Sequence, residues 1–252
     1  MALEHRRRRF PTTRWSVVVA AGDSVSPESQ AALSALCEAY WAPVYAYVCQ
    51  TGRSEDVAGD LTQAFFTRVL EKRDFRNARS DLGRFRSFLL TAVRYFLANQ
   101  VDYERSLKRG GGQVHLPLEP VAGGPCKAPA DRSSGETPET IYEQRWALTV
   151  LDQAMVKLAQ ESERAGRGRL FEGLRPFLTG DAEASYASCA QELGMTEGAV
   201  RVALHRLRGQ FGRHLRETLA ETVSDPGEID SEIQYLLRVL ARRHASSSLE
   251  QV

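Results

Sequence analysis

A group of side chains between residues 201 and 208 has the type and spacing to contact nucleic acid. The group consists of Arg201, His205, Arg206 and Arg208. An α-helix has about 3.6 residues per turn, so these positions point away from the apolar residues between them. An arginine on such a face can read the edge of a guanine in the major groove or bind a phosphate. The segment therefore predicts contact with duplex DNA.

The elements expected to position these side chains form a helix-turn-helix over residues 185–208. Gly194 can adopt the positive φ that ends a helix, and the Thr196 hydroxyl can accept a free backbone N–H at the start of the next one. Met195 supplies an apolar side chain in the turn. An ordinary helical hairpin with a solvated basic face is the alternative. The apolar positions expected to face inward are Tyr186, Cys189, Ala190, Leu193, Ala199, Val200, Ala203, Leu204 and Leu207.

Composition predicts a soluble globular protein with local separation of charge. The 252 residues are 42% hydrophobic and 26% charged, and the formal net charge is only +1. Residues 201–216 are strongly basic and residues 217–232 are acidic. A nucleic-acid surface must therefore arise from a local cluster of cations, because the chain as a whole is nearly neutral.

The cysteines and the N-terminus predict a cytoplasmic protein. No pair of cysteines has a C-x-x-C spacing, so we expect reduced thiols and no disulfide frame or zinc site. Residues 6–9 are arginines, but residues 10–13 lack the apolar run of a signal peptide, and no segment is long enough to insert into a membrane. The cysteines are Cys37, Cys49, Cys126 and Cys189.

Apolar residues recur at helical spacing over residues 29–50, 57–69 and 85–100, which predicts an all-α chain. Pro43 is expected to interrupt or restart the first of these helices. Glycines and prolines fill residues 108–138, which predicts a flexible linker. The expected organisation is an N-terminal extension (1–28), a helical domain (29–107), the linker (108–138), a helix-turn-helix domain (139–216) and a C-terminal extension (217–252).

Aromatic and arginine residues alternate over residues 84–105, a composition that suits single-stranded nucleic acid. Aromatic rings can stack on unpaired bases while arginines bind the backbone. Phe88 and Phe96 share the apolar face and are expected in the core. Exposed contact is expected instead from Tyr95, Asn99 and Tyr103. The alternating residues are Arg84, Phe85, Arg86, Phe88, Arg94, Tyr95, Phe96, Tyr103 and Arg105.

Three motifs in order resemble bacterial sigma factors of the extracytoplasmic-function type. DLTQAFF at residues 60–66 resembles that family's D-L-x-Q-E-x-F, and RFRSFLLTAVR at residues 84–94 resembles R-F-R-x-W/F-L-x-x-x-A/V-R. MTEGAVRVALHRLR at residues 195–208 resembles I/M-S-E-G-T/A-V-K-x-x-L-H-R-x-R. Residues 12–16 and 221–226 look like a subgroup familiar from planctomycete-like bacteria. The resemblance covers about residues 10–240.

The resemblance implies a protein that binds core RNA polymerase and directs it to promoter DNA. The first domain would dock on the polymerase and capture a base flipped from the minus-ten element. The second would place its recognition helix in the minus-thirty-five major groove. The implied polymerase contacts are Asp60, Gln63, Phe66 and Arg68; the minus-ten contacts are Arg94, Asn99, Asp102, Tyr103 and Arg105; the minus-thirty-five contacts are Thr196, Glu197, Arg201, His205, Arg206 and Arg208.

No catalytic residue, metal or cofactor is implied, because the polymerase performs the chemistry. An anti-sigma factor or another regulator is a further candidate partner. Without the resemblance, Asp60 and Gln63 are as well explained as solvent-exposed helix residues as by contact with a polymerase.

The chain departs from the family pattern at several positions. Ala64 stands where glutamate is usual, which removes a possible charge contact with the polymerase. The pair 202–203 is less polar than usual, so Ala203 could touch a thymine methyl group instead of a phosphate. In the C-terminal extension an amphipathic helix is expected to pack on the helix-turn-helix domain, with contact to a regulator as the alternative. Its expected stripe is Ile233, Leu236, Leu237 and Leu240.

Two other classes of function are alternatives to a sigma factor. A conventional helix-turn-helix regulator would use the same recognition helix without docking on polymerase. An enzyme acting on nucleic acid is disfavoured, because the chain has no H-E-x-x-H, P-loop or G-x-S-x-G motif and its histidines are scattered. We also expect the free chain to bind promoter DNA weakly, because it is nearly neutral and makes few phosphate contacts.

Overall fold

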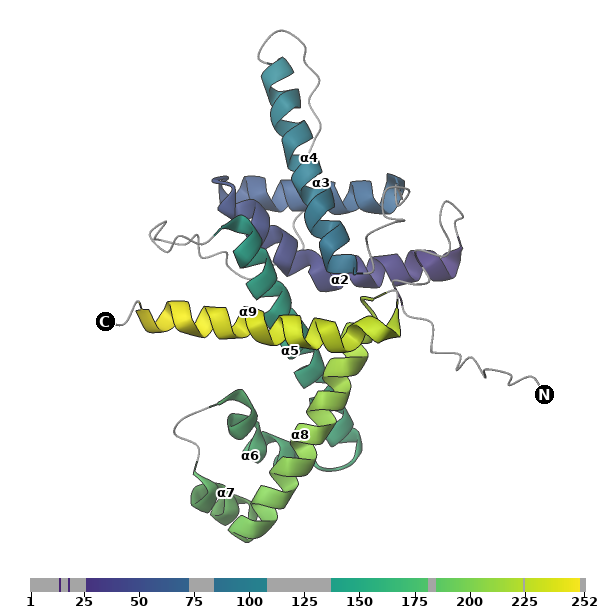
Figure 1. Cartoon of the computed structure of the whole chain (residues 1–252). Coiled ribbons are helices and arrows are strands. Elements are labelled where there is room, and N and C mark those ends of the chain that lie inside the picture. The colour runs from purple at the N-terminus through teal and green to yellow at the C-terminus, as the bar shows by residue number, and fades with distance from the viewer. Residues whose placement is uncertain are drawn as a thin grey trace, which may run out of the picture. The chain divides into compact units, whose positions relative to one another are not determined.

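The computed structural model describes residues 14, 18, 26–72, 84–107, 137–180, 185–223 and 225–249. Within these ranges the protein is all-α and contains no strand, apart from one isolated antiparallel β-bridge between Arg84 and Val223 (Figure 1). The helices are α2 (Pro27–Gln50), α3 (Glu55–Lys72), α4 (Phe85–Leu107), α5 (Pro138–Arg164), α6 (Gly168–Thr179), α7 (Tyr186–Leu193), α8 (Glu197–Ala220), the 3₁₀ turn η3 (Pro226–Glu228) and α9 (Ile229–Leu249).

The chain divides into two compact units. Unit 1 comprises Met1–Thr149 together with Ala220–Val252, and unit 2 comprises Val150–Leu219. The first division therefore falls inside α5 and the second at the end of α8. Most of the predicted linker, residues 108–136, lies outside the described residues, as does Cys126.

Helices α2, α3 and α4 supply much of the core of unit 1. Ser26 caps α2, because its side-chain oxygen accepts the backbone N–H of Ser29 at 3.0 Å, and Pro27 occupies the first turn. The predicted interruption at Pro43 is wrong: α2 continues through this buried proline to Gln50. The buried apolar side chains include Leu33, Leu36, Val44 and Val48 of α2, Ala58, Leu61 and Phe65 of α3, and Phe85, Leu89 and Val93 of α4.

The first turns of α5 also belong to unit 1, where they bury large aromatic side chains. Trp146 donates from Nε1 to the hydroxyl of Tyr40 at 3.0 Å, and the Tyr142 hydroxyl donates to the backbone oxygen of Arg86, also at 3.0 Å. Both Trp146 and Tyr142 are 1% exposed. These bonds satisfy polar atoms that would otherwise be buried without a partner.

The C-terminal helix α9 is an amphipathic helix, as expected, but it belongs to unit 1 rather than to the helix-turn-helix residues. Among its described side chains, Leu236 and Val239 are the buried apolar ones, at 0% and 4% exposure, whereas Leu237 is 58% exposed. The predicted stripe therefore included one residue that faces solvent. Tyr235, also in α9, hydrogen-bonds to Glu143 of α5.

A buried ion pair joins α9 to α4. The Arg86 guanidinium donates to both carboxylate oxygens of Glu232, at 2.9 and 3.0 Å, and Arg84 reaches the same carboxylate at 2.8 Å. Arg86 is 8% exposed and Glu232 only 1%. Burial alone would lower the pKa of Arg86, but the hydrogen bonds and charge of Glu232 raise it above its usual value. Charged residues at this depth are stable only when paired in this way.

Unit 2 contains the remainder of α5 with α6, α7 and α8 up to Leu219. Its core cluster joins these four helices through Leu158, Phe171, Leu174, Cys189, Ala190, Val200, Leu204 and Leu207. No described helix of either unit combines the length and the low charge needed to cross a membrane.

Candidate nucleic-acid interface

The turn between α7 and α8 has the geometry that the sequence predicts. Gly194 ends α7 with a φ of 66°, a left-handed conformation in which its N–H reaches the backbone oxygens of Ala190 and Gln191. The Thr196 hydroxyl accepts the backbone N–H of Ala199 at 3.2 Å and so caps α8. Met195 packs partly buried against the core cluster. Gly194 and Thr196 together fix where α8 begins.

Close packing between α6 and α7 holds the helix-turn-helix in place. A Cβ atom added to Gly173 would lie 3.1 Å from Cδ1 of Leu193, which is tighter than ordinary contact. The Cys189 thiol donates to the backbone oxygen of Gly173 at 3.3 Å, and burial raises its pKa. A larger residue at position 173 would therefore push α7 away from α6.

The cationic residues of α8 face outward as predicted. Arg201, His205, Arg206 and Arg208 are all exposed, and so are Thr196 and Glu197 at the start of the helix. The apolar side of the helix faces the core, since Val200, Leu204 and Leu207 are at most 6% exposed. The helix therefore presents a basic face to solvent while its apolar face completes the core of unit 2.

The four outward side chains of this face differ in how firmly they are held. Arg201 lies 4.4 Å from the centre of the Tyr186 ring and 3.8 Å from Glu197, and Arg208 donates to the backbone oxygen of Phe177 at 3.4 Å. Within the described ranges, the side chains of His205 and Arg206 have no hydrogen bond or ion pair. Arg206 is therefore the arginine of this group that can turn toward a ligand without losing an internal contact.

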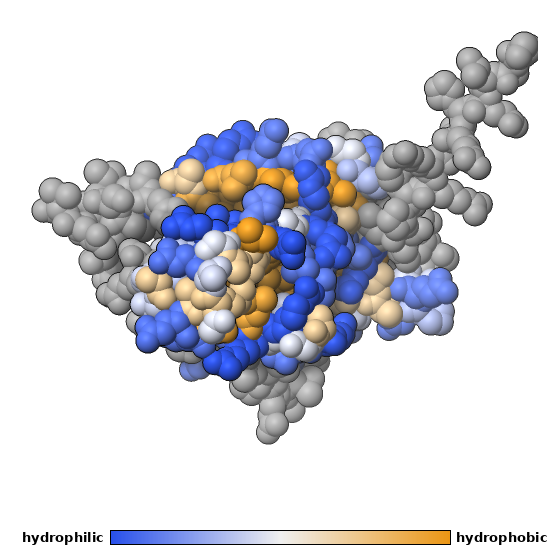
Figure 2. All heavy atoms as spheres, turned by 90° about the horizontal axis from the view of Figure 1, so that it is seen from below, coloured by the Kyte–Doolittle hydropathy of each residue, from blue (hydrophilic) through white to orange (hydrophobic). Residues whose placement is uncertain are grey.

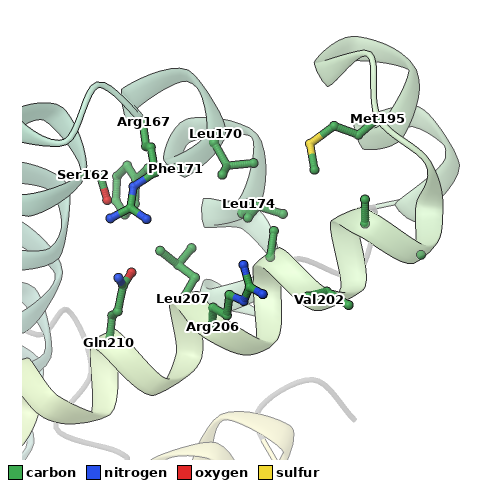
Figure 3. Close-up of a pocket in the computed structure, with 13 residues that line it drawn as sticks. Ser162, Arg167, Leu170, Phe171, Leu174, Met195, Val202, Arg206, Leu207 and Gln210 are labelled. Carbon is green, nitrogen blue, oxygen red and sulfur yellow. The ribbon is translucent and has the colours of Figure 1, made fainter.

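A cavity of about 470 Å³ lies beside α8 within unit 2. Its lining is largely apolar and includes Leu170, Phe171 and Leu174 of α6. Figure 3 shows Arg167 opposite Gln210 and Arg206 across this cavity. In Figure 2, hydrophobic surface shown in orange is framed by hydrophilic side chains in blue. Arg206 lines this cavity and is also exposed on the basic face of the helix.

The predicted minus-ten residues lie on α4 of unit 1. Arg94 and Asn99 are exposed, and Arg94 is 3.8 Å from a carboxylate oxygen of Glu139. Tyr95, also expected to be exposed, has 70% of its surface accessible. The side chains of the remaining three residues fall outside the described part of the chain, although the residues belong to α4: Asp102, Tyr103 and Arg105.

Other members of the aromatic and arginine pattern are core residues. Phe85 is 0% exposed and Arg86 is bound to Glu232, so neither can contact a nucleic-acid strand in this structure. Phe96 is 8% exposed, as expected of a core residue, and Phe88 is partly buried. The alternation of residue types therefore overstated the surface available for single-stranded contact.

The predicted polymerase-binding residues lie on α3 with three different degrees of exposure. Asp60 and Arg68 are exposed and Gln63 is partly exposed. Phe66, in contrast, is 4% exposed and its ring stacks on Trp41 with the ring centres 5.5 Å apart. A polymerase-binding surface on α3 would therefore consist of the three polar side chains. Phe66 is buried and packs α3 against Trp41 of α2.

Sequence reasoning missed the contact that holds Arg201 over Tyr186. The two residues belong to different helices, and the periodicity of one helix carries no information on the pairing.

Within the described ranges, no group of His, Cys, Asp and Glu side chains is arranged to hold a metal ion. Comparisons of this chain with protein-family models, curated proteins and solved structures give no match. The geometry of the two units and the sequence motifs are therefore what support a function.

Proposed function

We propose that this protein is a sigma factor that binds core RNA polymerase and directs transcription from specific promoters. The observation that carries the proposal is the basic outward face of α8, capped by Thr196 and anchored through its apolar face in unit 2. An exposed helix of this kind fits the major groove of a minus-thirty-five element, with Arg206 free to donate to a guanine. The polymerase supplies all catalytic chemistry.

Exposed polar residues on unit 1 support the part of the proposal that concerns polymerase and the minus-ten element. Asp60, Gln63 and Arg68 are available for polymerase on α3. On α4, Arg94 and Asn99 are available for melted DNA, with the exposed ring of Tyr95 beside them. A helix-turn-helix regulator that acts without polymerase has no need for these two surfaces.

The test is capture of bacterial core RNA polymerase by the full chain, followed by run-off transcription on genomic fragments. Polymerase capture together with new promoter-dependent transcripts is the expected result. Specific retention of duplex DNA by the free chain, without polymerase capture, would instead establish a conventional helix-turn-helix regulator.

Substitution of Arg206 separates DNA reading from polymerase binding. Arg206→Ala is expected to lower promoter-dependent transcription by about 5- to 150-fold, since a bidentate contact with guanine contributes about 1–3 kcal/mol. Polymerase capture should not change. Arg175→Ala is the matched control, because Arg175 is an exposed arginine of α6 in the same unit. Equal transcription from the two variants would contradict the role of Arg206.

Charge reversal on α3 addresses the polymerase surface. Asp60→Lys is expected to weaken polymerase capture, whereas Glu71→Lys, at another exposed acidic position of the same helix, should leave it unchanged. Equal capture by both variants would remove α3 from the docking surface.

A further inference from the structure

Val202 is an apolar side chain on the otherwise basic face of α8. It is 53% exposed, while Val200 and Leu204 on the opposite side of the helix are at most 2% exposed. No other large hydrophobic side chain described in α8 is exposed to this extent. A single exposed valine needs no explanation on its own, so its neighbours on the helix decide what it can do.

The neighbours of Val202 leave it unobstructed. Gly198 lies one turn before it, and a Cβ atom built there would have only the Thr196 hydroxyl at 4.0 Å. Gly209 follows about two turns later, and a Cβ atom there would meet nothing within 4 Å. Neither glycine has a side chain that would hold the helix away from a groove wall. Val202 therefore stands on a part of α8 that can approach another molecule closely.

Among the described residues, Arg206 is the arginine of the group 201–208 whose side chain has no internal partner, and it lies next to Val202. Arg206 follows Val202 by four positions, so the two side chains share a face one turn apart, and both border the cavity beside α8 (Figure 3). Arg206 is exposed and makes no side-chain hydrogen bond or ion pair among the described residues. An apolar group and a free guanidinium are therefore presented together.

Ala203, which the sequence suggested as the contact for a thymine methyl group, is placed differently. It packs partly buried against the core cluster of unit 2. Ala203 also lines the cavity, but it is only partly exposed, so Val202 is the more accessible apolar side chain on this face.

We propose that Val202 contacts the C5-methyl group of a thymine, next to a guanine that Arg206 reads. This inference rests on the proposed function, because it assumes that α8 enters the major groove. There, thymine presents a methyl group and guanine presents two acceptors. Side chains one helical turn apart are separated by about 5.4 Å and base pairs by about 3.4 Å. The thymine and the guanine therefore belong to base pairs that are adjacent or separated by one.

The experiment removes that methyl group and nothing else. Promoter DNA is first selected from random sequence by the full chain bound to core RNA polymerase. Each thymine of the selected upstream element is then replaced in turn by deoxyuridine. Competition binding of the polymerase complex measures the ratio of affinities for the two forms. Burial of one methyl group is worth about fourfold in affinity, which is the expected loss at a single thymine near the guanine.

Val202→Ala is expected to abolish this preference for thymine over deoxyuridine at that position. Val156→Ala is the matched control, because Val156 is a valine of α5 in the same unit with 54% exposure. Both substitutions favour the helix equally, so a difference between them reflects DNA contact and not folding. The control variant should keep the fourfold preference.

The outcomes separate this inference from the proposed function. If no thymine shows the preference, or if Val202→Ala retains it, the role of Val202 is overturned while polymerase-dependent selection still supports a sigma factor. If the chain selects duplex DNA without binding polymerase, the proposed function fails, and the same substitution on that DNA decides the role of Val202. If no DNA is selected under either condition, both proposals are overturned.

Discussion

The ion pair between Arg86 and Glu232 joins the two segments of the chain that form unit 1. The pair is nearly inaccessible to water, and the guanidinium also lies 3.9 Å from the centre of the Tyr235 ring and 5.1 Å from that of Trp146. From the sequence, Arg86 is one of several arginines that could bind a nucleic-acid backbone, and its partner is 146 positions away. Only the tertiary fold brings the two charges together.

Removal of one charge from this pair should destabilise the protein strongly. Glu232→Gln is expected to lower the free energy of unfolding by about 3 kcal/mol, because the guanidinium of Arg86 stays buried without its full counter-charge. Urea denaturation measures this change. Glu221→Gln is the control: Glu221 pairs with Arg14 at 3.3 Å on the surface, and its loss should cost no more than about 1 kcal/mol. Equal losses would mean that the buried pair contributes no more than an exposed one.

At the scale of elements, apolar periodicity predicted much of the fold. It located α2, α3, α4, α7 and the start of α8, because each buries a stripe of side chains at helical spacing. It failed at Pro43, where the loss of one backbone hydrogen bond is outweighed by burial of Tyr40, Val44 and Val48 on either side. It also identified the outward residues of α8. It could not show that Arg201 contacts Tyr186 and Glu197, whereas the side chain of Arg206 has no hydrogen bond or ion pair among the described residues.

The turn between α7 and α8 should be sensitive to any side chain at Gly194. Gly194→Ala is expected to destabilise the protein by about 1–2 kcal/mol, because a Cβ atom is strained at a φ of 66°. Gly209→Ala, in the middle of α8 with open space around it, should stabilise by roughly 0.5–1 kcal/mol. Thermal unfolding of the two variants measures both effects. A loss of stability at both positions would argue against a special role for the turn.

The contact between α5 and α8 should respond to acid. His214 lies 2.5 Å from Glu161 and 2.9 Å from Glu217, and Arg213 lies 3.2 Å from Glu161. The hydrogen bond from His214, with a further one from Arg213, lowers the pKa of Glu161 despite desolvation. The stability that this carboxylate supplies is therefore present at neutral pH and is lost as the pH falls through its lowered pKa.

Glu161→Gln tests this dependence directly. The variant should be less stable than the unsubstituted protein at neutral pH, and the difference should shrink as the pH falls below the usual glutamate range of about 4–5. Urea titrations from neutral pH to below that range give the measurement. Glu163→Gln, at an exposed position of the same helix, should show a small difference at every pH. A Glu161 effect that does not vary with pH would contradict the assignment.

At the scale of the whole molecule, unit 1 is built from segments at both ends of the sequence, whereas unit 2 is continuous. Composition and periodicity predicted the C-terminal helix but not its place, because an apolar stripe shows that a helix packs and not what it packs against. The backbone N–H of Phe85 donates to the oxygen of Thr222 at 2.9 Å, which is a second link between the two segments of unit 1.

Deletion of the C-terminal segment should therefore loosen unit 1. A chain that ends after Val223 lacks Glu232, Leu236 and Val239, all buried. Hydrogen exchange is expected to accelerate in peptides from α4 and from the first turns of α5, while peptides from α6 and α7 keep their protection. A chain that ends after Arg243 retains those three residues and should exchange like the full chain. Faster exchange confined to unit 2 would contradict the assignment of α9 to unit 1.

The discontinuity of unit 1 also orders events during translation. The ribosome completes residues 150–219 before it makes residues 220–249, so all of unit 2 can fold while unit 1 still lacks α9. Until that helix emerges, Arg86 has no buried counter-charge, and α4, the helix that carries Arg94, lacks this contact with α9. A nascent chain would therefore gain the basic face of α8 first and a fully packed unit 1 last.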